Sequence, residues 1–146
     1  MIRRILTAVA LLVCAAGVTR ADAQRSHFGV RGGYNFDLDE GSIGAQLHMP
    51  LSSSIELYPS FDYYFVNTGN LLGISGDLKF RTPGAPLYVG GGLNVLTGDG
   101  NSDTGFDLFG GLETRYGQTH PFVEARALFH DSSALQLLFG LNVTLY

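Results

Sequence analysis

The residue types best suited to catalysis lie close together near the C-terminal end, where His130 and Ser132 flank Asp131. A serine hydroxyl beside a histidine base can attack an ester when a third group orients the histidine. No Asp or Glu follows Asp131 to supply that orienting acid. We therefore expect residues 130–132 to form a polar hairpin turn rather than a catalytic pair.

A second candidate is a short run of oxygen-bearing side chains, in which Asp99, Asn101 and Asp103 recur at every second position. Calcium loops use this spacing, together with a Gly at the sixth position and a Glu at the twelfth. Thr104 and Gly110 occupy those two positions here. The run is therefore read as a flexible loop, with a weak surface cation site as the alternative.

The remaining histidines, His27, His48 and His120, are scattered along the sequence and predict no metal site. Cys14 is the only cysteine, so the chain after it offers neither a disulfide framework nor thiol chemistry. We expect no catalytic residue, no cofactor and no metal ion, and hence no enzymatic activity.

The segments that position these residues show apolar and polar side chains in alternation, with a period of two residues. In the last segment an unbroken apolar row alternates with a mixed, mostly polar row, and this pattern predicts a β-strand with two different faces. That apolar row consists of Leu135, Leu137, Phe139, Leu141, Val143 and Leu145. Eight segments of this kind can be read, at 28–36, 42–49, 54–65, 71–81, 87–97, 104–116, 121–130 and 134–146. An all-β, eight-stranded, antiparallel up-and-down barrel is predicted.

The charged residues of these segments all lie in the row opposite the apolar one. They are Arg31, Glu56, Asp62, Asp77, Lys79, Arg81, Asp107, Glu113, Arg115, Glu124 and Arg126, six acids and five bases. A near balance of charge is expected where charges are enclosed and must pair, for example Glu56 or Glu113 with Arg31, Arg115 or Arg126. Glycines of the same row leave room for these side chains: Gly29, Gly33, Gly44, Gly90, Gly92 and Gly111.

The sequence pattern is compatible with two environments for the apolar face. In a transmembrane barrel the apolar row faces lipid, whereas in a soluble, lipocalin-like barrel it turns inward around an apolar ligand. Aromatic residues near segment ends favour lipid, because membrane barrels carry aromatic girdles at both interfaces. These are Tyr34, Phe36, Tyr63, Phe65, Phe106, Tyr116 and Tyr146. We therefore predict a transmembrane barrel, with both chain ends in the periplasm.

The connections between the segments differ in charge in a way that fits this orientation. The first, third, fifth and seventh connections together are acidic, and the longest is expected at 97–103. They carry Asp37, Asp39, Glu40, Asp99, Asp103 and Asp131 and no base. The other connections are short, uncharged turns rich in Pro and Gly.

The N-terminal residues predict export. Arg3 and Arg4 precede an apolar stretch too short to span a bilayer, and small residues at Ala21 and Ala23 suit a signal peptidase. Residues 1–23 are therefore predicted to be a cleaved signal peptide, and 24–146 the barrel domain. This segment contains 12 acids and 6 bases, and its formal charge of −6 argues against nucleic acid as a partner.

The sequences FGVRGGYNF at 28–36 and FGLNVTLY at 139–146, within eight segments, resemble the small eight-stranded outer-membrane β-barrel family. This family includes the OmpA transmembrane domain, OmpX and the opacity-protein type. The resemblance implies a porin-like fold in the outer membrane of a Gram-negative cell, with a structural or surface-interaction role. It also implies contact with lipopolysaccharide and phospholipid, insertion by the outer-membrane assembly machinery, and a monomer.

A second resemblance keeps an enzymatic alternative open. Outer-membrane lipid A deacylases are also eight-stranded, and they carry a His-x-Ser pattern near the outer rim, similar to His130 and Ser132. This chain has Ser133 where that family has Asn. A hydrolase of lipid esters is therefore the alternative to a structural role.

Overall fold

The computed structural model describes residues 25–114 and 116–146, so the predicted signal peptide, Cys14 and Arg115 lie outside the described residues. The described residues form eight strands: β1 His27–Asn35, β2 Glu40–Pro50, β3 Ile55–Tyr64, β4 Leu71–Arg81, β5 Leu87–Gly98, β6 Asn101–Glu113, β7 Thr119–Phe129 and β8 Ser133–Thr144. None of these residues forms a helix of the length and apolar character needed to cross a membrane.

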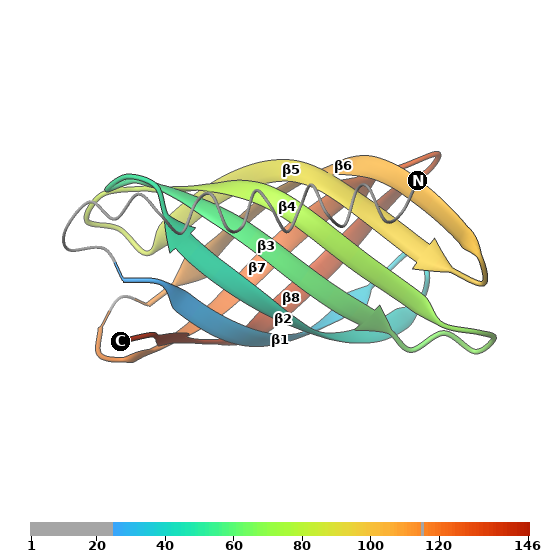
Figure 1. Ribbon diagram of the computed structural model, residues 1–146, viewed down its shortest axis with the longest axis horizontal. Coiled ribbons are helices and arrows are strands. Elements are labelled where there is room, and N and C mark those ends of the chain that lie inside the picture. Colours follow the sequence, from blue (N-terminus) through green and yellow to red (C-terminus); the bar gives the residue numbers. More distant parts are fainter. Residues whose placement is uncertain (1–24, 115) are drawn as a thin grey trace.

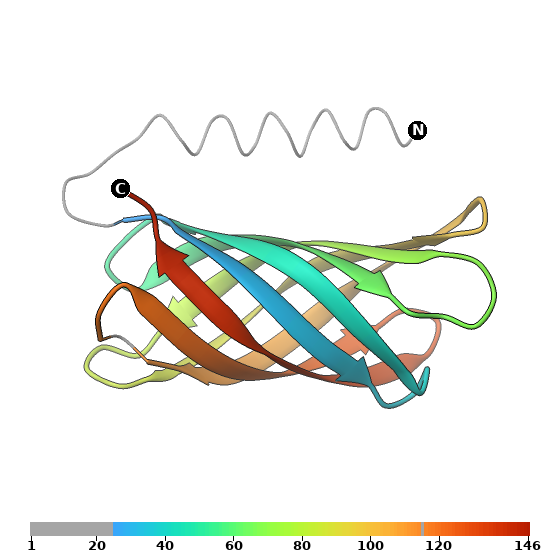
Figure 2. The same ribbon diagram turned by 90° about the horizontal axis from the view of Figure 1, so that it is seen from below.

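The strands close into a barrel in chain order (Figure 1). Each strand pairs antiparallel with the next, and β8 pairs back with β1, where Val30 lies opposite Leu141. Figure 2 shows β1 and β8 side by side along this closure. Because every ladder is paired, the sheet has no free edge. The predicted eight-stranded up-and-down barrel is confirmed.

The two ends of the barrel differ in the connections they carry. One end, here called the terminal end, holds the first residue of β1, the last residue of β8, the turns 51–54 and 82–86, and the end of β6 with the start of β7. The opposite end, the loop end, holds the connections 36–39, 65–70, 99–100 and 130–132. In Figure 1 the terminal end is at the left, where the C-terminus is marked.

The β5–β6 connection differs from the prediction of a loop at 97–103. The two strands remain paired as far as Gly98 and Asn101, which leaves only Asp99 and Gly100 in the turn. Both residues have positive φ, 47° at Asp99 and 83° at Gly100, as the two central positions of a type I′ hairpin turn require. The prediction was wrong because a tight hairpin allows the ladder to continue into the acidic run.

The apolar rows point outward. Leu93, Phe139 and Ile43 are 66%, 62% and 57% exposed, whereas the interior side chains of Arg126 and Glu124 are 1% and 0% exposed. The orientation predicted for a transmembrane barrel is therefore confirmed. It contradicts the lipocalin-like alternative, in which the apolar row would surround a ligand inside the barrel.

Aromatic side chains gather in pairs on the outer surface towards the loop end. The rings of Tyr34 and Phe36 lie 5.3 Å apart and those of Tyr63 and Phe65 lie 5.5 Å apart, both edge to face. A third pair is formed across the β6–β7 ladder, where Phe106 stacks on Phe129. Amphipathic and apolar rings in this position form the kind of girdle that lies at a membrane–water interface.

Candidate functional site: the charged interior and the two mouths

The interior bases each contact acids from other strands. Arg31 of β1 reaches across to β3, where its Nε donates to Asp62 Oδ1 at 2.8 Å and its Nη2 donates to Ser60 Oγ at 2.9 Å. The second guanidinium nitrogen also contacts Asp62, which makes the pair bidentate. Arg31 and Asp62 are almost fully buried, so this pair ties β1 to β3 inside the barrel.

Arg126 of β7 holds three carboxylates at once. Its Nη1 donates to Asp77 Oδ2 at 2.9 Å and to Asp107 Oδ2 at 3.0 Å, while its Nε donates to Glu124 Oε1 at 3.0 Å. Asp77 and Asp107 lie on either side of Gly92 in the β4–β5–β6 register. A side chain on Gly92 would collide with Asp77, so this glycine makes room for the charged cluster.

A third group of charges lies at the terminal end and joins three strands. Lys79 Nζ donates to Glu113 Oε2 at 2.7 Å, and Arg81 Nε donates to Glu56 Oε1 at 2.6 Å. Arg81 Nη2 also donates to both carboxylate oxygens of Glu113 at 3.1 Å. Two bases thus alternate with two acids, and each charge has an opposite charge beside it.

An aromatic layer in the interior separates these charged groups. Tyr58, Tyr88 and Phe109 form a buried cluster, with Lys79 Nζ 3.8 Å from the centre of the Tyr88 ring and Arg126 Cζ 4.5 Å from that of Phe109. Cations over ring faces at these distances are attracted by the ring quadrupole. Sequence reasoning missed this layer, although the three residues occupy the same row as the charges.

The predicted plug of ion pairs is confirmed, but Arg31 and Arg126 do not pair with Glu56 or Glu113, and the suggested pairing with Arg115 lies outside the described residues. Glu56 and Glu113 pair with Arg81, and Glu113 also pairs with Lys79, rather than with Arg31 or Arg126. The partners differ because the strands are tilted and staggered. Residues at the same height along the barrel axis therefore occupy different positions within their strands.

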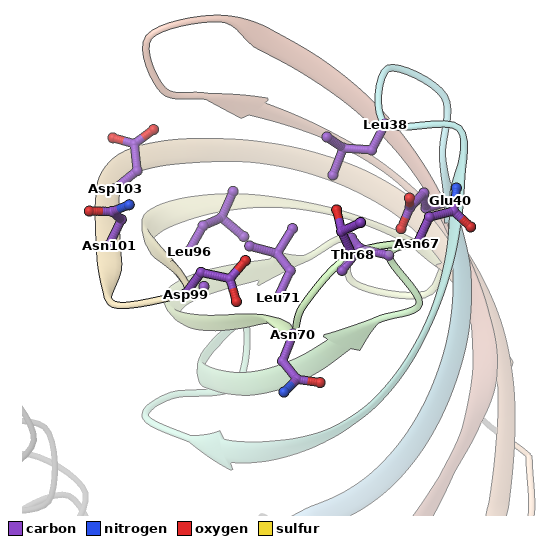
Figure 3. A pocket seen from close by; sticks show the side chains of 12 residues that line it. Leu38, Glu40, Asn67, Thr68, Asn70, Leu71, Leu96, Asp99, Asn101 and Asp103 are labelled. Carbon is purple, nitrogen blue, oxygen red and sulfur yellow. The ribbon is translucent and has the colours of Figure 1, made fainter.

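The loop end contains an acidic cup (Figure 3). Its volume is about 660 Å³, and its lining includes Glu40, Asp99 and Asp103 but no base. Apolar side chains, among them Leu71 and Leu96, also line it. Asn101 and Asp103 extend along β6, with Asp99 in the preceding turn, so the predicted flexible loop is absent from this part of the described chain. No described group of three or more His, Cys, Asp and Glu side chains is arranged to hold a metal.

His130 and Ser132 lie in the β7–β8 connection at the loop end. The backbone N–H of His130 donates to the Ser132 carbonyl at 3.1 Å, which closes a tight turn as predicted. Ser132 is exposed, and among the hydrogen bonds of the described residues none joins the His130 ring to the Ser132 hydroxyl. The arrangement lacks the contact that would activate a serine nucleophile.

The other three histidines, which are scattered along the sequence, are brought together at one end of the barrel. At the terminal end the ring of His27 lies 4.9 Å from that of His120 and 6.2 Å from that of His48, measured between centroids. Each belongs to an interior-facing row and lies within three residues of a strand end. This shared position was a signal in the sequence, but it becomes informative only when the strands are assembled.

Comparisons with known proteins agree with this fold. No protein-family model matches the sequence, and no curated protein matches it. The N-terminal β-barrel domain of Pseudomonas aeruginosa OprF is similar in structure, with a TM-score of 0.67 and 19% identity over 84% of this chain and 98% of that one. Neisserial surface protein A gives a TM-score of 0.59 and 11% identity over 83% and 95% of the two chains.

A designed transmembrane β-barrel is also similar. It gives a TM-score of 0.61 and 15% identity, and the match covers 87% of this chain and all of the other. At these identities the comparisons establish the fold alone. The fold is that of the small eight-stranded outer-membrane barrels, as the sequence resemblance implied.

Proposed function

We propose that this chain is a small outer-membrane barrel protein with a structural or surface-interaction role and no enzymatic activity. The observation that carries the proposal is the reversal of polarity: the apolar rows are exposed and the ionised side chains are sequestered. Water would make such a surface unstable, whereas lipid favours it. The paired aromatic rings near the loop end support a bilayer interface at that height.

In the proposed orientation the terminal end faces the periplasm and the loop end faces outward. Acidic side chains occur in three of the four connections at the loop end and in none of the turns at the terminal end, and this asymmetry supports the orientation. We expect insertion by the outer-membrane assembly machinery and contact with lipopolysaccharide and phospholipid. The closed sheet leaves no edge for strand exchange, which supports a monomer.

The filled interior favours a structural role over conduction. Asp77, Arg126 and Glu124 lie near the middle of the barrel and are at most 1% exposed. Moving ions past them would require breaking several buried ion pairs. We assign the surface interaction to the loop end, where the acidic cup would attract a partner that carries positive charge.

Fractionation of cells that express the full chain tests this proposal. The chain should pellet with the outer membrane, and unboiled samples should migrate differently from boiled ones because the closed barrel resists unfolding. Recovery of folded chain in the soluble periplasmic fraction would overturn the proposal. A soluble control protein with a signal peptide establishes that the periplasmic fraction was released completely.

A further inference from the structure

The charges inside the barrel do not balance among the described residues. Six acids and four Lys or Arg residues lie in the interior rows: Glu56, Asp62, Asp77, Asp107, Glu113, Glu124, Arg31, Lys79, Arg81 and Arg126. The ion pairs at the terminal end use two bases and two acids, and Arg31 pairs with Asp62. Arg126 alone remains for three acids. The excess of acid is therefore concentrated around Arg126.

Glu124, the first of these three acids, has a donor on each carboxylate oxygen. The Tyr88 hydroxyl donates to Glu124 Oε2 at 2.9 Å, and Arg126 Nε donates to Glu124 Oε1 at 3.0 Å. Donors of this kind stabilise the ionised form of a buried carboxylate. The unbalanced charge therefore lies with the other two acids, Asp77 and Asp107.

Asp77 and Asp107 each have one oxygen without a donor. Their Oδ2 atoms accept from the same atom, Arg126 Nη1, at 2.9 Å and 3.0 Å. Their Oδ1 atoms are buried and have no hydrogen-bond partner among the described residues. Both residues are only 1% exposed. An ionised oxygen that is buried without a donor loses its hydration and receives nothing in return, so two ionised carboxylates fit this place poorly.

The register brings the two carboxyl groups together. Asp77 of β4 and Asp107 of β6 both lie opposite Gly92 of β5, from its two sides. A Cβ on Gly92 would collide with Asp77 Oδ1, so this oxygen extends over the glycine. The two side chains lie within hydrogen-bonding reach of each other. Ionised carboxylates only accept, so a hydrogen bond between them requires a proton.

We propose that Asp77 and Asp107 bind one proton between them, so that the pair is a carboxylic acid and a carboxylate at neutral pH. The O–H of one group donates to the other, which gives a donor to a buried oxygen and removes one negative charge beside Arg126. Two carboxylates that share a site characteristically hold such a proton. The proton belongs to the pair and is assigned to neither residue alone.

The surrounding groups offer no other positive charge to the pair. Arg126 is the only base of the described residues that contacts either aspartate. The next bases, Arg31 and Lys79, are bound to Asp62 and Glu113. The titratable and charged groups around the pair are Arg31 of β1, Tyr58 of β3, Lys79 of β4, Tyr88 of β5, and Glu124 and Arg126 of β7. None of them replaces the proton.

Infrared spectroscopy of the purified chain at neutral pH tests the proposal. The sample is held in alkyl maltoside micelles, which contain no carbonyl group, so the C=O stretch of a protonated carboxylic acid is visible. The unsubstituted chain should show this band. Asp77→Asn and Asp107→Asn should each lose it, because the amide N–H donates to the remaining carboxylate without a titratable proton. Asp103→Asn, in the same row of β6 near the loop end, is the matched control and should keep the band.

The boiled and unboiled gel shift verifies that each variant is folded. Absence of the band from the unsubstituted chain, as expected if a water molecule donates to two ionised carboxylates, would overturn the proposal. Its persistence in either folded aspartate variant would also do so. Neither result bears on the proposed membrane location, since the measurement concerns the interior of the purified barrel.

The pH dependence of urea unfolding provides a second measurement. Exposed aspartates of the unfolded chain are ionised near neutral pH, so unfolding releases the shared proton. The unfolding equilibrium constant of the unsubstituted chain should therefore rise with pH, relative to that of Asp107→Asn, by about tenfold per pH unit. The same pH dependence in both chains would contradict the shared proton.

Discussion

Replacement of Leu93 by Arg tests whether lipid surrounds the barrel. Leu93 lies in the middle of β5, opposite Gly76 of β4 and Phe106 of β6, and its side chain is 66% exposed. In a bilayer this outward-facing position lies in the apolar band, where an arginine costs up to about 2–4 kcal/mol. In water the same substitution at an exposed site would change stability by no more than about 0.5 kcal/mol.

Thr104→Arg is the matched control. Thr104 is exposed, lies on β6 and shares the outward row of Phe106, but it is nearer the loop end. An arginine close to the interface costs about 0–1 kcal/mol. The two variants therefore introduce the same charge on the same face and differ in depth.

The assay is reversible urea unfolding of the two variants and the unsubstituted chain in phosphatidylcholine vesicles, followed by circular dichroism and gel mobility. Linear extrapolation gives the free energy of unfolding, and equal m-values show that the unfolded surface is unchanged. Leu93→Arg should lose about 2–4 kcal/mol and Thr104→Arg less than half of that. Equal stability of Leu93→Arg and the unsubstituted chain would refute the lipid-facing assignment.

Two further predictions concern the interior and the loop end. Arg126→Met would leave three buried carboxylates without their shared partner, so the free energy of unfolding should fall by about 3–5 kcal/mol in the same urea assay. A loss below about 1 kcal/mol, as for exposed pairs, would contradict the buried network. Ser132→Ala should leave lipid A acylation of expressing cells unchanged, as judged by mass spectrometry, and a change in acylation would reinstate the hydrolase alternative.

The orientation of the strands could be predicted from the sequence because a strand has a period of two. The row that contains Leu137, Phe139 and Leu141 is exposed in the structure, and the row that contains Arg126 and Glu124 is buried. The alternation of apolar and polar residues alone is compatible with a barrel in lipid and with a barrel in water. The near balance of acids and bases in one row pointed to an enclosed face, and the structure confirms that enclosure.

The partners inside the barrel could not be predicted from the sequence, because they depend on how far each strand is staggered against its neighbours. Arg126 reaches Asp77, which lies three strands away in the closed sheet. The histidine group depends on the same stagger and on closure, since β8 lies between β1 and β7. No local pattern encodes that closure.

The β5–β6 turn, in contrast, could have been predicted from local sequence. Asp-Gly between two alternating segments is a strong signal for a type I′ hairpin, and Asp99-Gly100 forms that turn. The spacing of oxygen-bearing residues suggested a loop instead. In the structure Asn101 and Asp103 recur on one face simply because β6 has a period of two.

Site-directed spin labelling tests the central claim, that the apolar face contacts lipid, most directly. Cys14 is the only cysteine and lies in the predicted signal peptide, so the barrel domain is a cysteine-free background for single labels at Phe139 and, at the loop end, at Asn101. In vesicles, a label at Phe139 should collide readily with oxygen and poorly with a water-soluble nickel reagent, and a label at Asn101 should show the reverse. A Phe139 label that is immobilised and shielded from both reagents would place that face inside the protein and contradict the account.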